Sequence, residues 1–264
     1  MKTLIHRLLK ACCTVAVAVM LVACGGATST VDPFKPTRVI GLGDGYVLLS
    51  NSVLSQVAAD FGQSNVVSLA NAAHSISNLS GQIALIPGGV TSTDLVVISI
   101  GTNDLKGGLP QANYATKVGV LVTQIQGLLG TGKHVLVMPV LDLSRTPWGK
   151  ASNPVFSSTA TADFNSELSR QLASNFGGRS SNPVIYGDGY VSPISSQFRS
   201  MTDPINPTNW VSPLNQYDFG NCVANCTDSS TSLFDTGVSD TYLTTAGMQW
   251  AGNLLYAATS QGWR

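Results

Sequence analysis

Charged side chains are scarce in this chain of 264 residues. Lysine and arginine together number 14, aspartate and glutamate also number 14, and charged residues make up 11% of the sequence. An average domain carries roughly 25% charged residues. The net charge is zero and no basic patch stands out, which argues against nucleic acid as a partner. Glycine, serine, threonine and asparagine are plentiful instead, a composition that fits an exported protein.

Histidine and cysteine are also few, which limits metal chemistry. The histidines are His6, His74 and His134, and only Cys222 and Cys226 among the five cysteines lie outside the N-terminal region. A zinc site at the cysteine pair would need further ligands, and no histidine lies near it. We therefore predict no metal site. In an oxidising compartment a pair with this spacing favours a local disulfide, which we predict here.

The N-terminus has the pattern of an export signal. Basic residues precede an apolar stretch from Ala11 to Ala23 that is too short to span a bilayer as a stable helix. The stretch ends in Leu-Val-Ala-Cys, which resembles the bacterial lipobox and implies a lipid anchor on Cys24. An ordinary secretory signal with an accidental cysteine is the alternative. Gly25 after the cysteine favours the outer membrane in a cell with two membranes, on its periplasmic or surface side.

Domain organisation follows from this reading of the N-terminus. We predict a lipoprotein signal peptide over 1–23, a lipidated cysteine with a flexible tether over 24–36, and one domain over 37–264. Within the domain, residues 191–232 are rich in loop formers and proline. So long an irregular stretch is often functional, and it could cap a binding site.

Hydrophobic periodicity in the domain alternates between strand and helix patterns. The first strand ends in a glycine-rich turn, and the helix after it runs from about Asn51 to Asp60, with Asn51 or Ser50 as its cap. The alternation predicts a three-layer α/β/α, flavodoxin-like fold around a central five-stranded parallel sheet. The other predicted strands are Val66–Ala70, Asp94–Ile100, Val135–Val140 and Val184–Tyr186. The other predicted helices span Ile76–Leu85, Asn113–Leu129, Phe164–Phe176 and Thr244–Ala258.

Two short motifs follow predicted strands. Gly43-Asp44-Gly45 comes after the first strand and Gly101-Thr102-Asn103-Asp104 after the third. In a parallel sheet both motifs reach the edge where ligands bind. They resemble the first and third blocks of the SGNH/GDSL hydrolases, a family of lipases and esterases. The resemblance implies carboxylic ester hydrolysis without a cofactor, with the Asn103 side chain and a backbone N–H at Ala72 or Ala73 forming the oxyanion hole.

The chain departs from this family at the catalytic residues. Gly45 stands at the position of the nucleophilic serine, and Tyr242 stands at that of the histidine. Ser239 occupies the aspartate position, with Asp240 one residue away. Ester hydrolysis of this kind needs a nucleophile, a base and a group that orients the base. We therefore interpret the chain as a degenerate member with a vestigial site composed of Asp44, Gly45, Ala73, Gly101, Asn103, Asp104, Asp240 and Tyr242.

Three alternatives to this interpretation remain open. A hydrolase could use Tyr46, Ser50 or Ser75 as nucleophile, with His74 as a substitute base. Asp44 and Asp104 could act as an acid/base pair or hold a metal. A dinucleotide site at residues 41–43 is the third, although Tyr46 replaces its last glycine. The preferred reading is a lipid-anchored envelope protein that binds an unknown ligand or protein partner and has no cofactor.

Overall fold

The structure is a computed structural model that describes residues 34–129, 134–146, 148–149, 152, 156–176, 184–186, 201–202, 210–211 and 245–262. The lipidation site Cys24 and the predicted disulfide pair, Cys222 and Cys226, lie outside these residues. Lipidation and the disulfide therefore stay predictions. Within the described ranges, no helix combines the length and the apolar character needed to cross a membrane.

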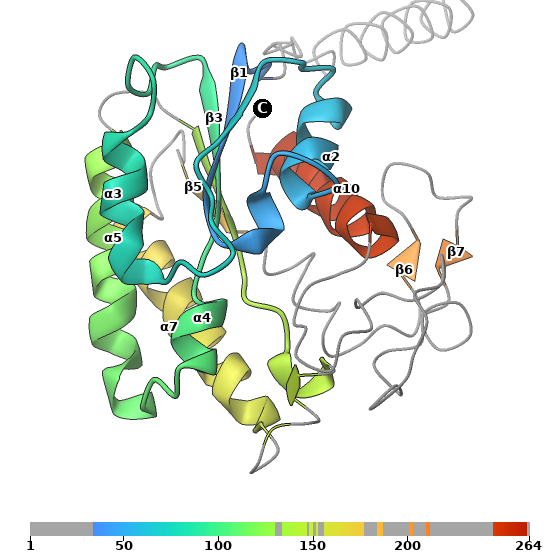
Figure 1. Ribbon diagram of the computed structural model, residues 1–264. Helices are drawn as coiled ribbons and strands as arrows, with labels where there is room; N and C mark the ends of the chain where they lie inside the picture. The colour runs from blue at the N-terminus through green and yellow to red at the C-terminus, as the bar shows by residue number, and fades with distance from the viewer. Residues whose placement is uncertain are drawn as a thin grey trace, which may run out of the picture. The chain divides into compact units, whose positions relative to one another are not determined.

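A five-stranded parallel sheet forms the centre of the fold, in the order β2-β1-β3-β4-β5 (Figure 1). Its strands are β1 (Arg38–Gly43), β2 (Val66–Ser68), β3 (Asp94–Ser99), β4 (His134–Met138) and β5 (Val184–Tyr186). β1 pairs with β3 along its whole length, from Arg38 opposite Asp94 to Gly43 opposite Ser99. This register brings the two sequence motifs to the same end of neighbouring strands.

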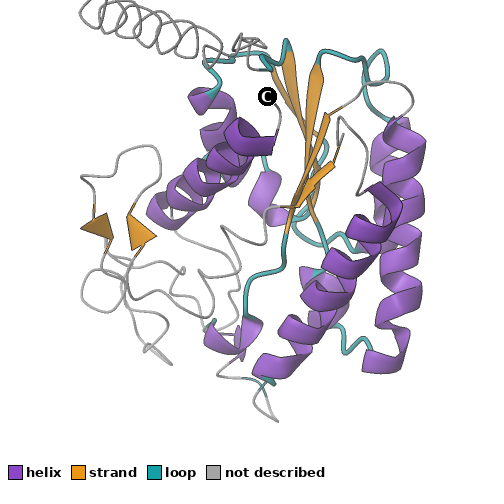
Figure 2. Ribbon diagram, turned by 180° about the vertical axis from the view of Figure 1, so that it is seen from behind, coloured by secondary structure: helices purple, strands orange, loops and turns teal. Residues whose placement is uncertain are grey.

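Helices cover both faces of the sheet (Figures 1 and 2). One face carries α3 (Leu79–Ala84), α5 (Tyr114–Leu129) and α7 (Ser158–Phe176). The other face carries α2 (Val53–Asp60) and α10 (Thr245–Gly262), which pack against each other. The predicted α/β fold with a parallel sheet is confirmed. The order of the strands matches the flavodoxin-like topology.

The strand sequences explain the two layers of the core. Successive side chains on a strand point to opposite faces, so a strand covered on both faces is apolar throughout. In β3, Leu95 and Val97 join the core on the α2/α10 side, whereas Val96 and Ile98 join the core on the α5/α7 side. All four are fully buried. Helices α5 and α7 fill the second core with Val118, Leu121, Ile125, Phe164, Leu168 and Phe176.

Short elements connect this framework. The most relevant is α4 (Thr102–Lys106), which follows β3 directly. An antiparallel pair, β6 (Met201–Thr202) and β7 (Trp210–Val211), occurs in the region predicted to be loop-rich. The described 3-10 turns are η1 (Gly45–Val47), η2 (Ile76–Asn78), η3 (Gln111–Asn113) and η4 (Leu143–Arg145).

Several local predictions were wrong in detail. Ser52, and not Asn51 or Ser50, caps α2, because its hydroxyl accepts from Ser55 N and the Ser55 hydroxyl accepts from Ser52 N. Asn51 has a φ of 48° and lies outside the helix. Leu85, predicted to end the helix that begins at Ile76, lies just beyond α3 and is 69% exposed. Helix α7 begins at Ser158 and not at the predicted Phe164. Its first turns consist of polar and small residues, which hydrophobic periodicity does not detect.

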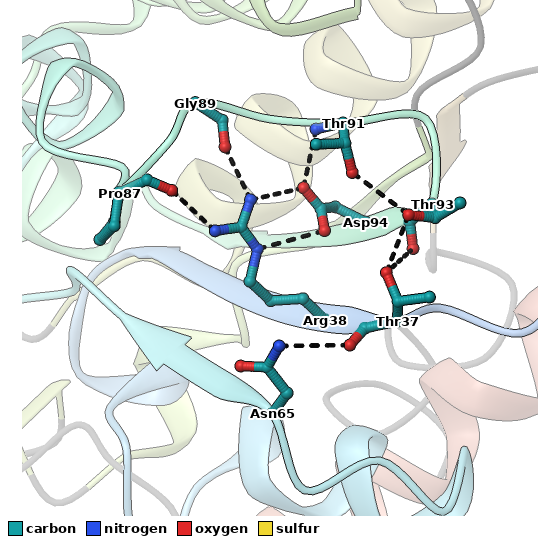
Figure 3. Close-up of polar contacts among 8 residues, drawn as sticks. All are labelled: Thr37, Arg38, Asn65, Pro87, Gly89, Thr91, Thr93 and Asp94. Atoms are coloured by element: carbon teal, nitrogen blue, oxygen red, sulfur yellow. Dashed lines mark hydrogen bonds and ion pairs between the residues drawn. The ribbon is translucent and has the colours of Figure 1, made fainter.

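An ion pair stabilises the amino end of the sheet, away from the motifs (Figure 3). The Arg38 guanidinium donates to both carboxylate oxygens of Asp94, at 3.1 and 2.6 Å. Its remaining N–H groups donate to Pro87 O at 2.8 Å and Gly89 O at 2.7 Å. Burial works to raise the pKa of Asp94, but hydrogen bonds from Arg38 and Thr91 outweigh it and lower that pKa. One side chain thus joins β1, β3 and the turn before β3.

Candidate functional site

The first glycine of each motif is required by packing. Gly43 has a φ of 120°, and a Cβ there would lie 1.8 Å from Ser99 O on the neighbouring strand. Gly101 has a φ of 119°, and a Cβ there would lie 2.9 Å from the Phe164 ring. Both backbones are left-handed and crowded, so L side chains are excluded. The fold alone therefore accounts for these two residues, whether or not any catalysis takes place.

Asp44 is a completely buried carboxyl at the end of β1. Its Oδ1 accepts from Ser99 Oγ at 2.9 Å and from Tyr46 N at 3.3 Å. Its Oδ2 has no hydrogen-bond partner within the described residues. Burial raises the pKa of Asp44 from 3.8 to about 6, against the effects of Ser99, the Tyr46 backbone and Thr102. The carboxyl ties β1 to β3 and begins η1, which is a structural role.

The nucleophile position offers no hydroxyl. Gly45 is buried at the start of η1. The next residue, Tyr46, is only 1% exposed and belongs to the apolar core under α2. Ser75 donates to the Asn78 side chain at 3.1 Å. Ser50 is exposed, and the ring of His74 has Gln82 as its one hydrogen-bond partner in the described residues.

The Asn103 side chain donates hydrogen bonds to backbone carbonyls of this chain. Its Nδ2 donates to Ala72 O at 2.8 Å and to His74 O at 2.7 Å. Both amide hydrogens are therefore used on backbone carbonyls, and neither is directed at a ligand. Asn103 connects α4 to the loop after β2. The resemblance predicts an oxyanion donor at this position, but the side chain instead makes hydrogen bonds that hold the loop after β2 in place.

Of the two candidate backbone donors, Ala72 and Ala73, the N–H of Ala73 is also engaged. Ala73 N donates to the Asn71 side chain at 2.9 Å, the hydrogen bond of an Asx turn. Ala73 itself is exposed. Asn103 Nδ2 and Ala73 N thus both have partners within the same short loop.

Asp104 is a connector between three elements. Its Oδ2 accepts from Ile76 N in η2 at 2.9 Å, and its Oδ1 lies 3.4 Å from Lys117 Nζ in α5. The side chain is 3% exposed. The charge of Asp104 contributes to the raised pKa of Asp44, so the two carboxyl groups lie in one region. No group of three or more possible metal ligands occurs in the described part of the chain.

Gln82 is the functional candidate that the sequence analysis missed. It lies on α3, is 3% exposed, and contacts both Gly43 and His74 through its amide. The signal was present: Gln82 follows Leu79 by three residues, on the apolar face of the segment. A polar residue at such a position must find hydrogen-bond partners inside the fold.

The remaining predicted residues lie elsewhere. Asp240 and Tyr242 fall outside the described residues, so their relation to the motifs stays a prediction. His134 begins β4 at the opposite end of the sheet, where its ring stacks on Phe34 at 3.6 Å between centroids. A surface hollow of about 300 Å³ contains none of the predicted site residues; it is lined by Gln111, Tyr114, Ala115, Asp163, Ser166 and Glu167.

Comparison with known proteins agrees with the residue patterns. The family model of the GDSL-like Lipase/Acylhydrolase matches residues 37–250. No curated protein matches the chain in sequence. A GDSL-like lipase of Bacteroides thetaiotaomicron has 15% identity and a TM-score of 0.51, over 85% of this chain and 88% of that one. A Bacteroides fragilis protein assigned as an acylhydrolase has 16% identity and a TM-score of 0.53, over 87% and 91%.

Proposed function

The chain belongs to the GDSL-like lipase/acylhydrolase family, and from this premise we propose that it is an exported, lipid-anchored member without ester-hydrolase activity, which binds a ligand or a protein partner in the cell envelope. The observation that carries the proposal is the state of the motif residues. Gly45 supplies no nucleophile, and the side chains of Asp44, Asn103 and Asp104 each have hydrogen-bond partners inside the fold. The export and anchoring part depends on the lipobox at Cys24.

The energetic argument concerns the transition state. An oxyanion donor contributes about 3 kcal/mol only when it is free to bind the developing charge. The Asn103 amide and the Ala73 N–H already have protein acceptors. Recruiting them for catalysis would break those hydrogen bonds. The glycine at position 45 removes the covalent step as well, and losses of this kind do not add but leave only weak residual catalysis.

The competing proposal is a GDSL-type esterase with a non-standard nucleophile. Membership of the family favours it. Exposed Ser50 lies five residues after Gly45, and Ser75 adjoins His74. Either hydroxyl would need a base, and the only histidine on this side of the sheet in the described residues is His74.

Ester hydrolysis decides between the two proposals. The chain, purified in detergent, is assayed with short- and medium-chain p-nitrophenyl esters beside the variants Ser50→Ala, Ser75→Ala and the double change Gly45→Ser with Tyr242→His. We expect wild-type rates equal to the buffer blank, and turnover only in the double variant. Circular dichroism confirms that each variant is folded. Wild-type turnover that either serine variant abolishes would refute the proposal and identify the nucleophile.

A further inference from the structure

The Gln82 amide is held in one orientation by the backbone of Gly43. Its Oε1 accepts from Gly43 N at 2.5 Å, and its Nε2 donates to Gly43 O at 2.9 Å. A backbone N–H can only donate and a backbone carbonyl can only accept. The pair of hydrogen bonds therefore distinguishes the amide oxygen from the amide nitrogen, which the shape of the side chain alone does not.

The second hydrogen on Gln82 Nε2 determines the tautomer of His74. That nitrogen lies 2.6 Å from His74 Nδ1. An amide nitrogen has no lone pair to offer, so Nδ1 must be the acceptor. A neutral imidazole that accepts at Nδ1 carries its proton on Nε2. His74 is therefore a fixed Nε2–H donor and does not have the tautomer of a general base acting through Nε2.

The exposed edge of the ring is available to a ligand. His74 is half-buried, and within the described part of the chain its Nε2 has no hydrogen-bond partner and is not an enclosed atom. The backbone of His74 is held on both sides, by Asn71 O accepting from its N–H at 2.9 Å and by Asn103 donating to its carbonyl at 2.7 Å. Donor and backbone are thus ordered before any ligand arrives, which lowers the entropic cost of binding.

The charges nearby restrict the ligand. Asp44 and Asp104 both carry carboxyl groups in this region, and Lys117 is already paired with Asp104. Among the described residues, the cation shown beside these carboxyl groups is Lys117, and it is paired with Asp104, so an anionic ligand would meet like charge there. An uncharged oxygen acceptor, such as an amide carbonyl, can accept from the Nε2–H donor without adding negative charge to this region.

We propose, on the basis of the ligand-binding role above, that Gln82 is a positioning residue that fixes His74 as an Nε2–H donor, and that His74 binds an uncharged oxygen acceptor of a ligand at the carboxyl end of β1. The geometry carries this proposal through one continuous chain of contacts, from the Gly43 backbone through the Gln82 amide to the His74 ring. No bond is made or broken in this step.

Nitrogen NMR of the full chain in detergent tests the tautomer. The chain has three histidines, so a long-range ¹H–¹⁵N spectrum is simple to assign with a His74→Phe variant. We expect His74 with an unprotonated Nδ1 and a protonated Nε2. In Gln82→Glu a carboxylate faces Nδ1, and the proton moves to Nδ1. A protonated Nδ1 in the wild type overturns the inference, whether or not the variant folds, and leaves the proposed function standing.

Two small probes test the ligand class. N-methylacetamide is an uncharged acceptor and acetate an anionic one, and each is titrated while the His74 Nε2 resonance is followed. We expect a saturable shift with N-methylacetamide, a smaller shift with acetate at equal concentration, and no saturable shift with either in Gln82→Glu. The expected tautomer without a shift from either probe overturns the binding role of His74. A larger shift with acetate overturns the assignment to uncharged ligands.

Discussion

Replacing Asp44 with asparagine gives the most direct test of the buried carboxyl at the end of β1. Burial raises the pKa of Asp44 to about 6 in the folded protein, from an ordinary value of 3.8. The folded state therefore binds this proton more tightly than the unfolded state. Stability from this group is fully present below about pH 4 and is lost as the pH rises through about 6.

The size of the effect follows from the shift. A difference of about two pKa units corresponds to about 3 kcal/mol, at 1.36 kcal/mol for each unit. Asparagine has nearly the shape of aspartate and no charge. Its Oδ1 can accept from Ser99 and from Tyr46 N as the carboxyl does. We expect Asp44→Asn to gain about 3 kcal/mol of stability relative to wild type between pH 4 and pH 7.5.

Urea unfolding followed by far-UV circular dichroism, at half-unit pH steps from 4 to 7.5, measures this difference. Asp94→Asn is the matched control, because Asp94 is also buried but its pKa is lowered. Its contribution is present above about pH 4 and lost as the pH falls through the folded-state pKa, so that variant should be most destabilised at neutral pH. Parallel pH profiles for Asp44→Asn and wild type would contradict the reasoning.

Three further outcomes are expected. Arg38→Lys should lower stability by about 1–3 kcal/mol in thermal unfolding, because lysine cannot make the forked contacts; an unchanged melting temperature would contradict this. Gly43→Ala should lower the free energy of unfolding by more than about 3 kcal/mol, because its Cβ would lie 1.8 Å from Ser99 O. Gly62 is also left-handed but lies in open space, so Gly62→Ala should lower it by only about 1 kcal/mol. Cys24→Ser should abolish palmitate labelling and release the chain from membranes; labelling that persists would exclude the lipobox.

Both motifs were identified from sequence, but their roles came from the structure. Gly43 is the last residue of β1 and Gly101 comes shortly after β3, and turns at such places favour glycine. The sequence did not reveal that neighbouring atoms exclude a Cβ at both positions. Asn103 was predicted as an oxyanion donor by resemblance, and its contacts are with carbonyls of the loop after β2. A motif specifies residue types in a loop, whereas the partners of those residues come from distant segments.

Local periodicity predicted most elements because strands and helices depend on nearby residues. The boundaries were less accurate where capping decides them, as at Ser52 and Ser158. Burial on both faces made β3 recognisable from its apolar run alone. Gln82 was overlooked because its importance depends on the backbone of a strand 39 residues away.

The sequence by itself determined the α/β class, the place of the motifs at strand ends, and the absence of a serine at position 45. These features depend on side-chain pattern and identity, which the chain carries locally. Only the tertiary structure decided which polar groups are already occupied, that Asp44 is buried with no partner for Oδ2 among the described residues, and that the Gln82 amide contacts Nδ1 of His74. Hydrogen-bond partners and dielectric environment arise when separate segments pack together, and no local pattern encodes them.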